Sequence, residues 1–177
     1  VSLAEARLQC KIDSDDTSHD AALESLITTA REYAQHYTGR ALAPQTLEVA
    51  LDAFPPFDNP SITLPLCPVT SITSIKYTDT AGAEQTLSNT KYALSPYGES
   101  RMLAPTYGNY WPTTQDIMNS VRIVPVCGYT TCPKAAKQAM LVHIELESPL
   151  NPHTPAEREA LEKARDSLLN TIKVYGR

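Results

Sequence analysis

Cys127 and Cys132 are separated by four residues, a spacing that suggests a metal site or a redox pair. A structural zinc site needs a second pair of ligands at a matching spacing. Cys67 is isolated, however, and no histidine lies close to either member of the pair along the sequence. We therefore interpret Cys127 and Cys132 as buried or half-buried thiols, with a metal or redox role as the alternative.

Histidine and acidic residues form two further partial motifs. His143 and Glu147 are four residues apart, so a helix would place them on one face, but a metal site of this type needs a second histidine. A hydrogen-bonded pair on a helix or an exposed interface patch is the favoured interpretation. Asp13, Asp15 and Asp16 resemble part of a calcium loop. The central glycine and the terminal glutamate of such a loop are missing, and we expect a solvated turn that caps the next helix.

Other catalytic arrangements are missing from the sequence. It contains no glycine-rich phosphate loop, no nucleophile elbow and no arginine-rich tract. We therefore predict that the protein is not an enzyme and has no catalytic residue, no cofactor and no metal ion. One alternative from another class stays open, a cytosolic metal- or small-molecule-binding protein that uses Cys127, Cys132 and His143.

Composition limits the class of protein further. A chain of 177 residues with 42% hydrophobic residues is long enough to bury a core and is not a disordered chain. No apolar run is long enough to span a membrane, and the first residues show no secretory signal, since no basic flank is followed by an apolar stretch. The net charge of −5 argues against a protein that wraps nucleic acid by neutralising phosphates.

The two ends of the chain carry helical signals. Ser2 and Glu5 form a capping box, and the apolar residues of about 20–38 recur at i, i+3, i+4 and i+7 before Gly39 offers a left-handed cap. Near the other end, Thr154 and Glu157 form a second capping box, which predicts a helix that runs to about Tyr175. Charged residues should cover the outer face of this last helix, namely Arg158, Glu159, Glu162, Lys163, Arg165 and Asp166.

The middle of the chain has the two-residue period of strands, interrupted by proline and glycine turns. Segment 121–126 is the last predicted strand, and Pro125 within it indicates an edge position or a bulge. We predict an α+β fold with a single domain over 1–177. A small helical bundle is built from both chain ends, 1–44 and 131–177, and the inserted antiparallel β-hairpin or sheet region is 45–130.

Two sets of residues are candidates for contact surfaces. Tyrosine is frequent, with nine copies against two phenylalanines and one tryptophan, and its ring with a polar tip suits half-buried contacts. The aromatic residues near the predicted hairpin tips either close the sheet or form a subunit or tail interface. They are Tyr92, Tyr97, Tyr107, Tyr110 and Trp111. The last helix either packs in the core or docks into a groove on a partner.

Five segments occur along the chain in an order that is informative as a set. A predicted helix ends in Tyr-Thr-Gly-Arg at 37–40, and a strand, a proline-flanked step and a second strand are predicted at 62–72. The remaining segments are 107–112, 121–129 and 133–140. Together they resemble the head–tail connector, or adaptor, proteins of long-tailed bacteriophages, prophages and gene-transfer agents. After the penultimate helix the chain has Glu147-Ser148-Pro149, where the family often has aromatic residues, so the resemblance is weaker there.

The resemblance implies a structural protein of the virion neck that is made in the host cytoplasm. Such a protein forms a ring of about twelve copies under the portal protein, extends the DNA channel and offers a surface to the tail or to a stopper or tail-completion protein. Double-stranded DNA would pass through without specific recognition. The end of the chain is the expected docking surface for the portal protein. Its candidate residues are Leu168, Leu169, Ile172, Lys173, Tyr175 and Arg177. A stopper or tail-terminator ring of the same particle is the alternative.

Overall fold

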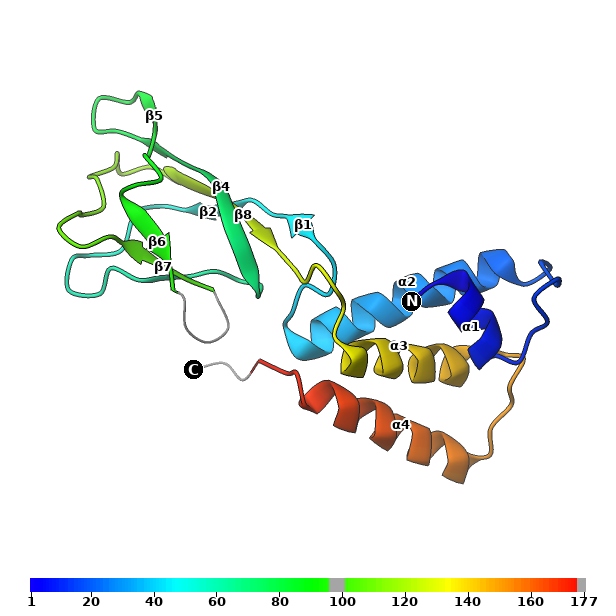
Figure 1. Cartoon of the computed structure of the whole chain (residues 1–177). Coiled ribbons are helices and arrows are strands. Elements are labelled where there is room, and N and C mark those ends of the chain that lie inside the picture. Colours follow the sequence, from blue (N-terminus) through cyan, green and yellow to red (C-terminus); the bar gives the residue numbers. More distant parts are fainter. Residues whose placement is uncertain (96–100, 175–177) are drawn as a thin grey trace. The chain divides into compact units, whose positions relative to one another are not determined.

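The computed structural model describes residues 1–95 and 101–174 and divides into two compact units. The helical unit contains Val1–Leu42 and the chain from Thr131 onward, whereas the β unit is Ala43–Thr130 (Figure 1). Helices and antiparallel sheets together make an α+β fold, as the sequence predicted. The description of 1–177 as a single domain stays a prediction.

Four helices form the helical unit. They are α1 (Leu3–Gln9), α2 (Asp20–Thr38), α3 (Lys134–Glu147) and α4 (Pro155–Asn170). Both predicted capping boxes are present, because Ser2 accepts from the Glu5 N–H and Thr154 accepts from the Glu157 N–H. Among the described helices, none is both long and apolar enough to cross a membrane.

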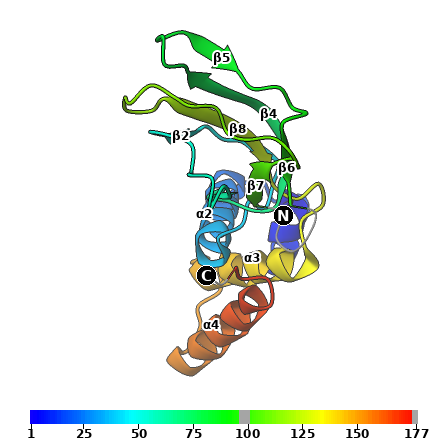
Figure 2. The ribbon, with the colours of Figure 1, turned by 90° about the vertical axis from the view of Figure 1, so that its left-hand side faces the viewer.

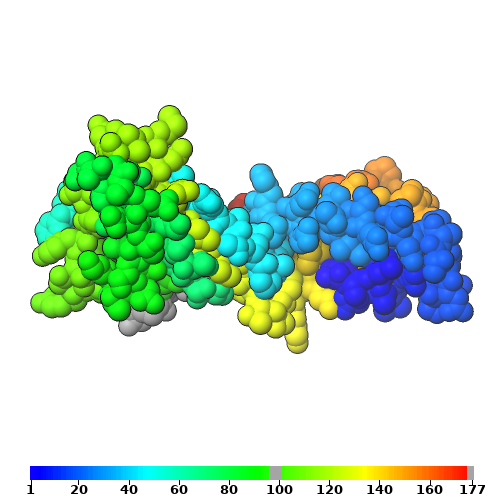
Figure 3. Space-filling view, turned by 90° about the horizontal axis from the view of Figure 1, so that it is seen from above, coloured from blue at the N-terminus to red at the C-terminus, as the bar shows by residue number. Residues whose placement is uncertain are grey.

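Helix α3 is the centre of this unit and packs against the other three helices. Its buried side chains are Ala136, Ala139, Met140, Val142, His143, Ile144 and Leu146. The facing helices contribute small residues such as Ala6, Ala30 and Ala34, which allow close approach of the backbones. Figure 3 shows α1, in dark blue, directly beside α2.

Helix α4 ends five residues earlier than the predicted Tyr175, which lies outside the described residues. The Thr171 and Ile172 amides donate to carbonyls three residues back, so the last turn tightens. The Val174 N–H then donates to the Thr38 carbonyl at 2.9 Å, and Arg40 donates to the Ile172 carbonyl. The segment after α4 is thereby hydrogen-bonded to the end of α2.

The β unit holds two antiparallel sheets (Figure 2). The five-stranded sheet has the order β1-β8-β4-β5, with β2 also paired to β8, and the three-stranded sheet has the order β3-β7-β6. The strands are β1 (Gln45–Thr46), β2 (Val49–Leu51), β3 (Ile62–Thr63), β4 (Val69–Thr78), β5 (Glu84–Thr86), β6 (Tyr92–Leu94), β7 (Met102–Pro105) and β8 (Val121–Cys127).

Strand β8 lies in the middle of its sheet, so an edge position for Pro125 is wrong. The proline is tolerated there because the neighbouring pairing is interrupted on both sides. Register shifts in β4 flank its partner Ile72, and β1 stops at Thr46 before β2 begins at Val49. A missing amide therefore costs the sheet little, and the predicted bulge is present.

Candidate functional site

An aromatic stack fixes two loops of the β unit. The Phe54 and Trp111 rings are parallel within 4° with centroids 4.8 Å apart, and Tyr77 meets Phe54 edge-on. The Trp111 Nε1–H donates to the Pro60 carbonyl at 2.7 Å. Because a half-buried indole needs a partner for its N–H, this bond joins the loop before β3 to the loop after β7.

These two loops enclose an apolar pocket of about 330 Å³, which we call the aromatic pocket. Its lining residues are Pro55, Phe57, Pro60, Pro105, Thr106, Tyr107, Gly108, Asn109, Tyr110 and Trp111. The ring centroids of Phe57 and Tyr110 lie 5.2 Å apart, and the two residues are 76% and 65% exposed. Tyr107 is fully exposed. A gathered set of exposed aromatic side chains is typical of a contact surface.

The structure sorts the five aromatic candidates. Tyr107, Tyr110 and Trp111 come together in the aromatic pocket. Tyr92 instead points into the core of the β unit at 9% exposure, where burial raises its pKa, and Tyr97 lies outside the described residues. Sequence reasoning missed Phe57, which lies among prolines in a segment that we interpreted only as a turn; an aromatic residue between prolines was the available signal.

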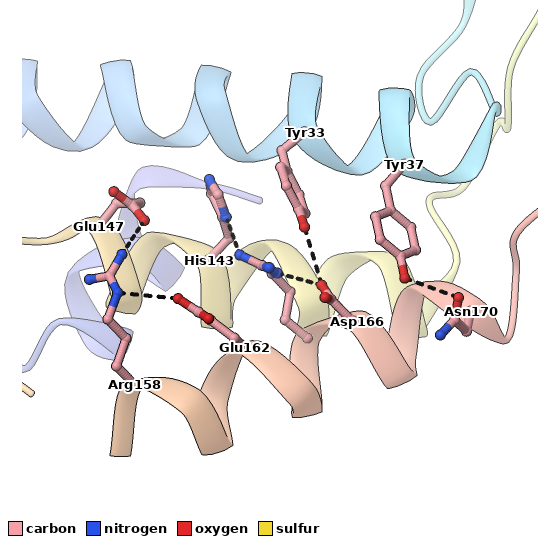
Figure 4. A network of polar contacts seen from close by, with 9 residues as sticks. Tyr33, Tyr37, His143, Glu147, Arg158, Glu162, Asp166 and Asn170 are labelled. Atoms are coloured by element: carbon pink, nitrogen blue, oxygen red, sulfur yellow. Dashed lines mark hydrogen bonds and ion pairs between the residues drawn. The ribbon is translucent and has the colours of Figure 1, made fainter. Parts of the chain in front are cut away.

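A second surface joins α4 to α2 and α3, and we call it the α4 seam (Figure 4). It consists of Tyr33, Tyr37, His143, Glu147, Arg158, Glu162, Arg165, Asp166 and Asn170. From α2, the Tyr33 hydroxyl donates to Asp166 at 3.2 Å and the Tyr37 hydroxyl donates to Asn170 at 3.1 Å. Polar contacts therefore dominate this helix junction.

Arg165 lies at the centre of the α4 seam. Its Nε–H donates to Asp166 at 2.8 Å, and its Nη1 lies 3.2 Å from His143 Nδ1. The guanidinium carbon also lies 4.3 Å from the centre of the Tyr33 ring, which stacks on the His143 ring. The expectation that Arg165 lies on the solvated face is thus wrong, because its charge finds partners in the seam.

The expected pairing of His143 with Glu147 is also wrong. Each residue instead bonds to an arginine of α4: His143 contacts Arg165, and Arg158 donates to Glu147 at 2.9 Å. Arg158 also pairs with Glu162 at 3.2 Å. The i, i+4 spacing correctly placed both residues on one helix face, but that face packs against another helix.

The docking candidates at the chain end differ in exposure. Leu169 is completely buried in the helical unit, so its side chain is part of the core. Leu168, Ile172 and Lys173 are half-buried, and the Lys173 ammonium lies 4.5 Å from the Tyr37 ring centre. The candidates Tyr175 and Arg177 lie outside the described residues.

The cysteines and the acidic turn have ordinary surroundings. Cys127 donates to the Leu66 carbonyl at 3.8 Å, and burial raises the pKa of the Cys127 and Cys132 thiols. Within residues 1–95 and 101–174, no three His, Cys, Asp or Glu side chains gather as a metal site. The acidic turn does not cap α2, because His19 is the N-cap and makes no side-chain cap bond.

Comparison with known proteins identifies relatives of this chain. Its residues 1–95 match the family model of phage gp6-like head-tail connector proteins. No curated protein sequence gave a significant match.

Solved structures share the fold over the whole chain. A chain in the neck of an empty gene transfer agent particle, computed with C6 symmetry, has a TM-score of 0.78 and 22% identity, covering 100% of this chain and 91% of that one. A chain of the native gene transfer agent virion has a TM-score of 0.74 and 23% identity with the same coverage. With more than half of its residues matched by the family model, this chain belongs to the phage gp6-like head-tail connector family.

Proposed function

We propose that this connector protein is a structural subunit of a virion neck that closes into a ring between the portal and the tail. The observation that carries the proposal is the fold match over the full chain to a neck protein, together with the family. The similar neck structures were computed with C6 and C12 symmetry, which supports a ring of about twelve copies built from head-to-tail contacts.

In this proposal, the chain end docks on the portal protein. Leu168, Ile172 and Lys173 stay partly accessible beside the end of α2, and they combine apolar contact with one positive charge. Tyr175 and Arg177 extend this candidate surface in the sequence. Leu169 contributes indirectly, because its burial anchors the end of α4, next to the segment that contains Ile172 and Lys173.

The aromatic pocket supplies the second contact, with a neighbouring subunit or with the tail or its stopper protein. Tyr107 and Tyr110 present large rings that lose little conformational entropy when they are buried by a partner. The net charge of −5 suits a channel wall, because like charge keeps the passing DNA from adhering. This role requires recognition and assembly but no catalysis.

Portal docking is tested with charge reversal in the segment that follows α4. Lys173→Glu should reduce co-sedimentation of the protein with portal-containing heads by at least tenfold. Lys163→Glu is the control of the same charge change, because Lys163 lies within α4, its side chain is 74% exposed, and it forms an ion pair with Glu159. Equal binding by the two variants would remove the docking assignment.

The ring is tested by mass photometry with and without portal. We expect complexes of about twelve copies when portal is present, and Tyr107→Ser with Tyr110→Ser should weaken ring closure or tail attachment. Met118→Ser, an 80% exposed apolar residue of another loop in the same unit, is the control. Electron microscopy of assembled particles gives the position, and a ring next to the tail instead of the portal would favour the stopper or tail-terminator role.

A further inference from the structure

Helix α4 is attached to the rest of its unit differently from α3. All of α4 is described, and within it only Arg165 and Leu169 are buried, whereas α3 buries seven residues. Hydrogen bonds and ion pairs of the α4 seam also join α4 to α2 and α3 (Figure 4). Directional contacts of this kind depend on the protonation state of each partner.

The contact between Arg165 and His143 fixes the protonation state of the histidine. A guanidinium has only donors, so His143 Nδ1, 3.2 Å from Arg165 Nη1, must be an acceptor. His143 is therefore neutral with its proton on Nε2. Figure 4 shows the His143 ring with one nitrogen toward this contact and the other toward α2.

A proton on Nδ1 is incompatible with this arrangement. It would place two donors and two positive charges face to face at a site where His143 is 7% and Arg165 is 9% exposed. Burial, and next the charge of Arg165, lower the pKa of His143. The Tyr33 ring stacks on His143 and lies under the guanidinium, so movement of Arg165 disturbs the contact with α2 as well.

The nearby carboxylates Glu147 and Asp166 favour the protonated histidine, but burial and the charge of Arg165 outweigh them and the pKa of His143 stays lowered. Asp166 already accepts from Arg165 and Tyr33, and Glu147 is paired with Arg158. The groups that face the histidine are Glu32, Tyr33 and His36 from α2, Glu147 from α3 itself, and Arg158, Arg165 and Asp166 from α4. Helix α1 meets α3 through Gln9 with Glu145 and Glu5 with Lys137.

We propose that the Arg165–His143 contact is a pH-sensitive latch, and that protonation of His143 releases α4 from α2 and α3 while the other helices stay packed. Opening uncovers Leu169 and frees Leu168 together with the following segment that contains Ile172 and Lys173. The connector between α3 and α4, which contains Pro149 and Pro152, is the hinge about which α4 moves away. The latch is a property of the free protein and does not depend on the identity of the docking partner.

The direction of the pH effect follows from the lowered pKa. In the open state His143 regains an ordinary pKa near 6.5, so the open state binds protons more readily than the closed one. The closed state is therefore fully favoured above about pH 6.5 and loses its advantage as the pH falls below that value. Between pH 7.5 and 5.5, linkage allows the opening constant to rise about tenfold.

Native-state hydrogen exchange on the free protein tests the latch. After correction for the intrinsic exchange rate, protection of α4 amides should fall about tenfold from pH 7.5 to 5.5, while protection of β8 should stay constant. His143→Asn should abolish the fall, because the amide oxygen replaces the Nδ1 acceptor and takes up no proton. His36→Asn, at an exposed histidine of α2 that lines the same surface pocket as His143, should behave like the wild type.

Any one of three results would overturn the latch. The first is that wild-type α4 keeps its protection at pH 5.5, and the second is that His143→Asn shows the same fall in protection as the wild type. The third is that protection falls equally in β8. If the Asn variant does not fold, ¹⁵N spectroscopy of wild-type histidines decides instead, since a proton on Nδ1 of His143 at pH 7.5 contradicts the acceptor role. Portal is absent from these experiments, so failure of portal docking leaves their result unchanged.

Discussion

The last helix of the helical unit and the central strand of the β unit are held by different contacts. In the β unit, β8 buries apolar side chains such as Val121 and Ile123 in the core. In the helical unit, α4 buries one leucine and one arginine, and hydrogen bonds and ion pairs join it to α2 and α3. Apolar burial tolerates small shifts, but a polar seam requires each donor to meet its acceptor.

This difference indicates where the molecule can change state. A sheet core opens only when much apolar surface meets water, and local opening of such elements approaches the cost of global unfolding. A helix held by a few directional bonds opens at lower cost when one partner changes its charge. Of the candidate docking residues, Leu168 lies on the second kind of element, and Ile172 and Lys173 lie in the segment that follows it.

The largest expected effect is a glycine substitution in the β unit. Gly128 has a φ of 118°, and a Cβ there would lie 2.1 Å from the Ala43 carbonyl oxygen. Gly128→Ala should destabilise the protein by more than about 2 kcal/mol, measured by chemical denaturation. Gly39→Ala is the matched variant of the helical unit, where φ is 68° and the nearest atom is 4.0 Å away, and it should cost about 1 kcal/mol. Equal costs would contradict the close backbone approach.

Removal of the one buried leucine of α4 should have the next largest effect. Leu169→Ala leaves a cavity at a fully buried position, and we expect a loss of about 2–4 kcal/mol in the free energy of unfolding. Leu168→Ala, at the half-buried neighbour, should cost clearly less. If both variants lose the same stability, the assignment of Leu169 to the core rather than to a docking surface fails.

Loss of single hydroxyls would show how much the polar seam contributes. Tyr33→Phe removes the part-buried bond to Asp166 and should cost about 1 kcal/mol in thermal or chemical unfolding. Tyr37→Phe removes the exposed bond to Asn170 and should cost less, about 0.5 kcal/mol. The reverse order would show that the outer end of the seam holds α4 more strongly than its centre.

The smallest effect concerns the capping box of α1. Hydrogen bonding, mainly from Lys137, lowers the pKa of Glu5 to about 2 from an ordinary 4.5. The stabilising contribution is therefore complete above about pH 4.5 and is lost as the pH falls toward 2. In an NMR titration, Lys137→Met should move the Glu5 midpoint back toward 4.5. A Glu5 midpoint that does not respond to this change would contradict the ion pair with α3.

Local signals predicted the beginnings of elements well. Ser2 and Thr154 mark helix starts because their hydroxyls meet amides only three residues away, and Gly39 ends α2 with a positive φ. In each case the interacting groups are close in sequence.

Local sequence signals did not predict the contacts within the candidate surfaces. Arg165 appears on the charged side of α4 in the sequence, and only its distant partner His143, on another helix, explains its burial. Phe57 meets Tyr110 across the β unit in a similar way. Periodicity tells which face of an element is apolar, but it does not identify polar partners that tertiary packing brings together.

The pairing of Gln45 with Cys127 also bears on how the chain reaches its native state. This pair joins the first and last strands of the β unit, so a folded β unit holds its two ends side by side. Helices α2 and α3, separated by the whole β unit along the chain, then meet as if a short loop joined them, because loop-closure entropy depends on effective loop length. Early formation of the sheet should therefore speed the docking of α2 on α3.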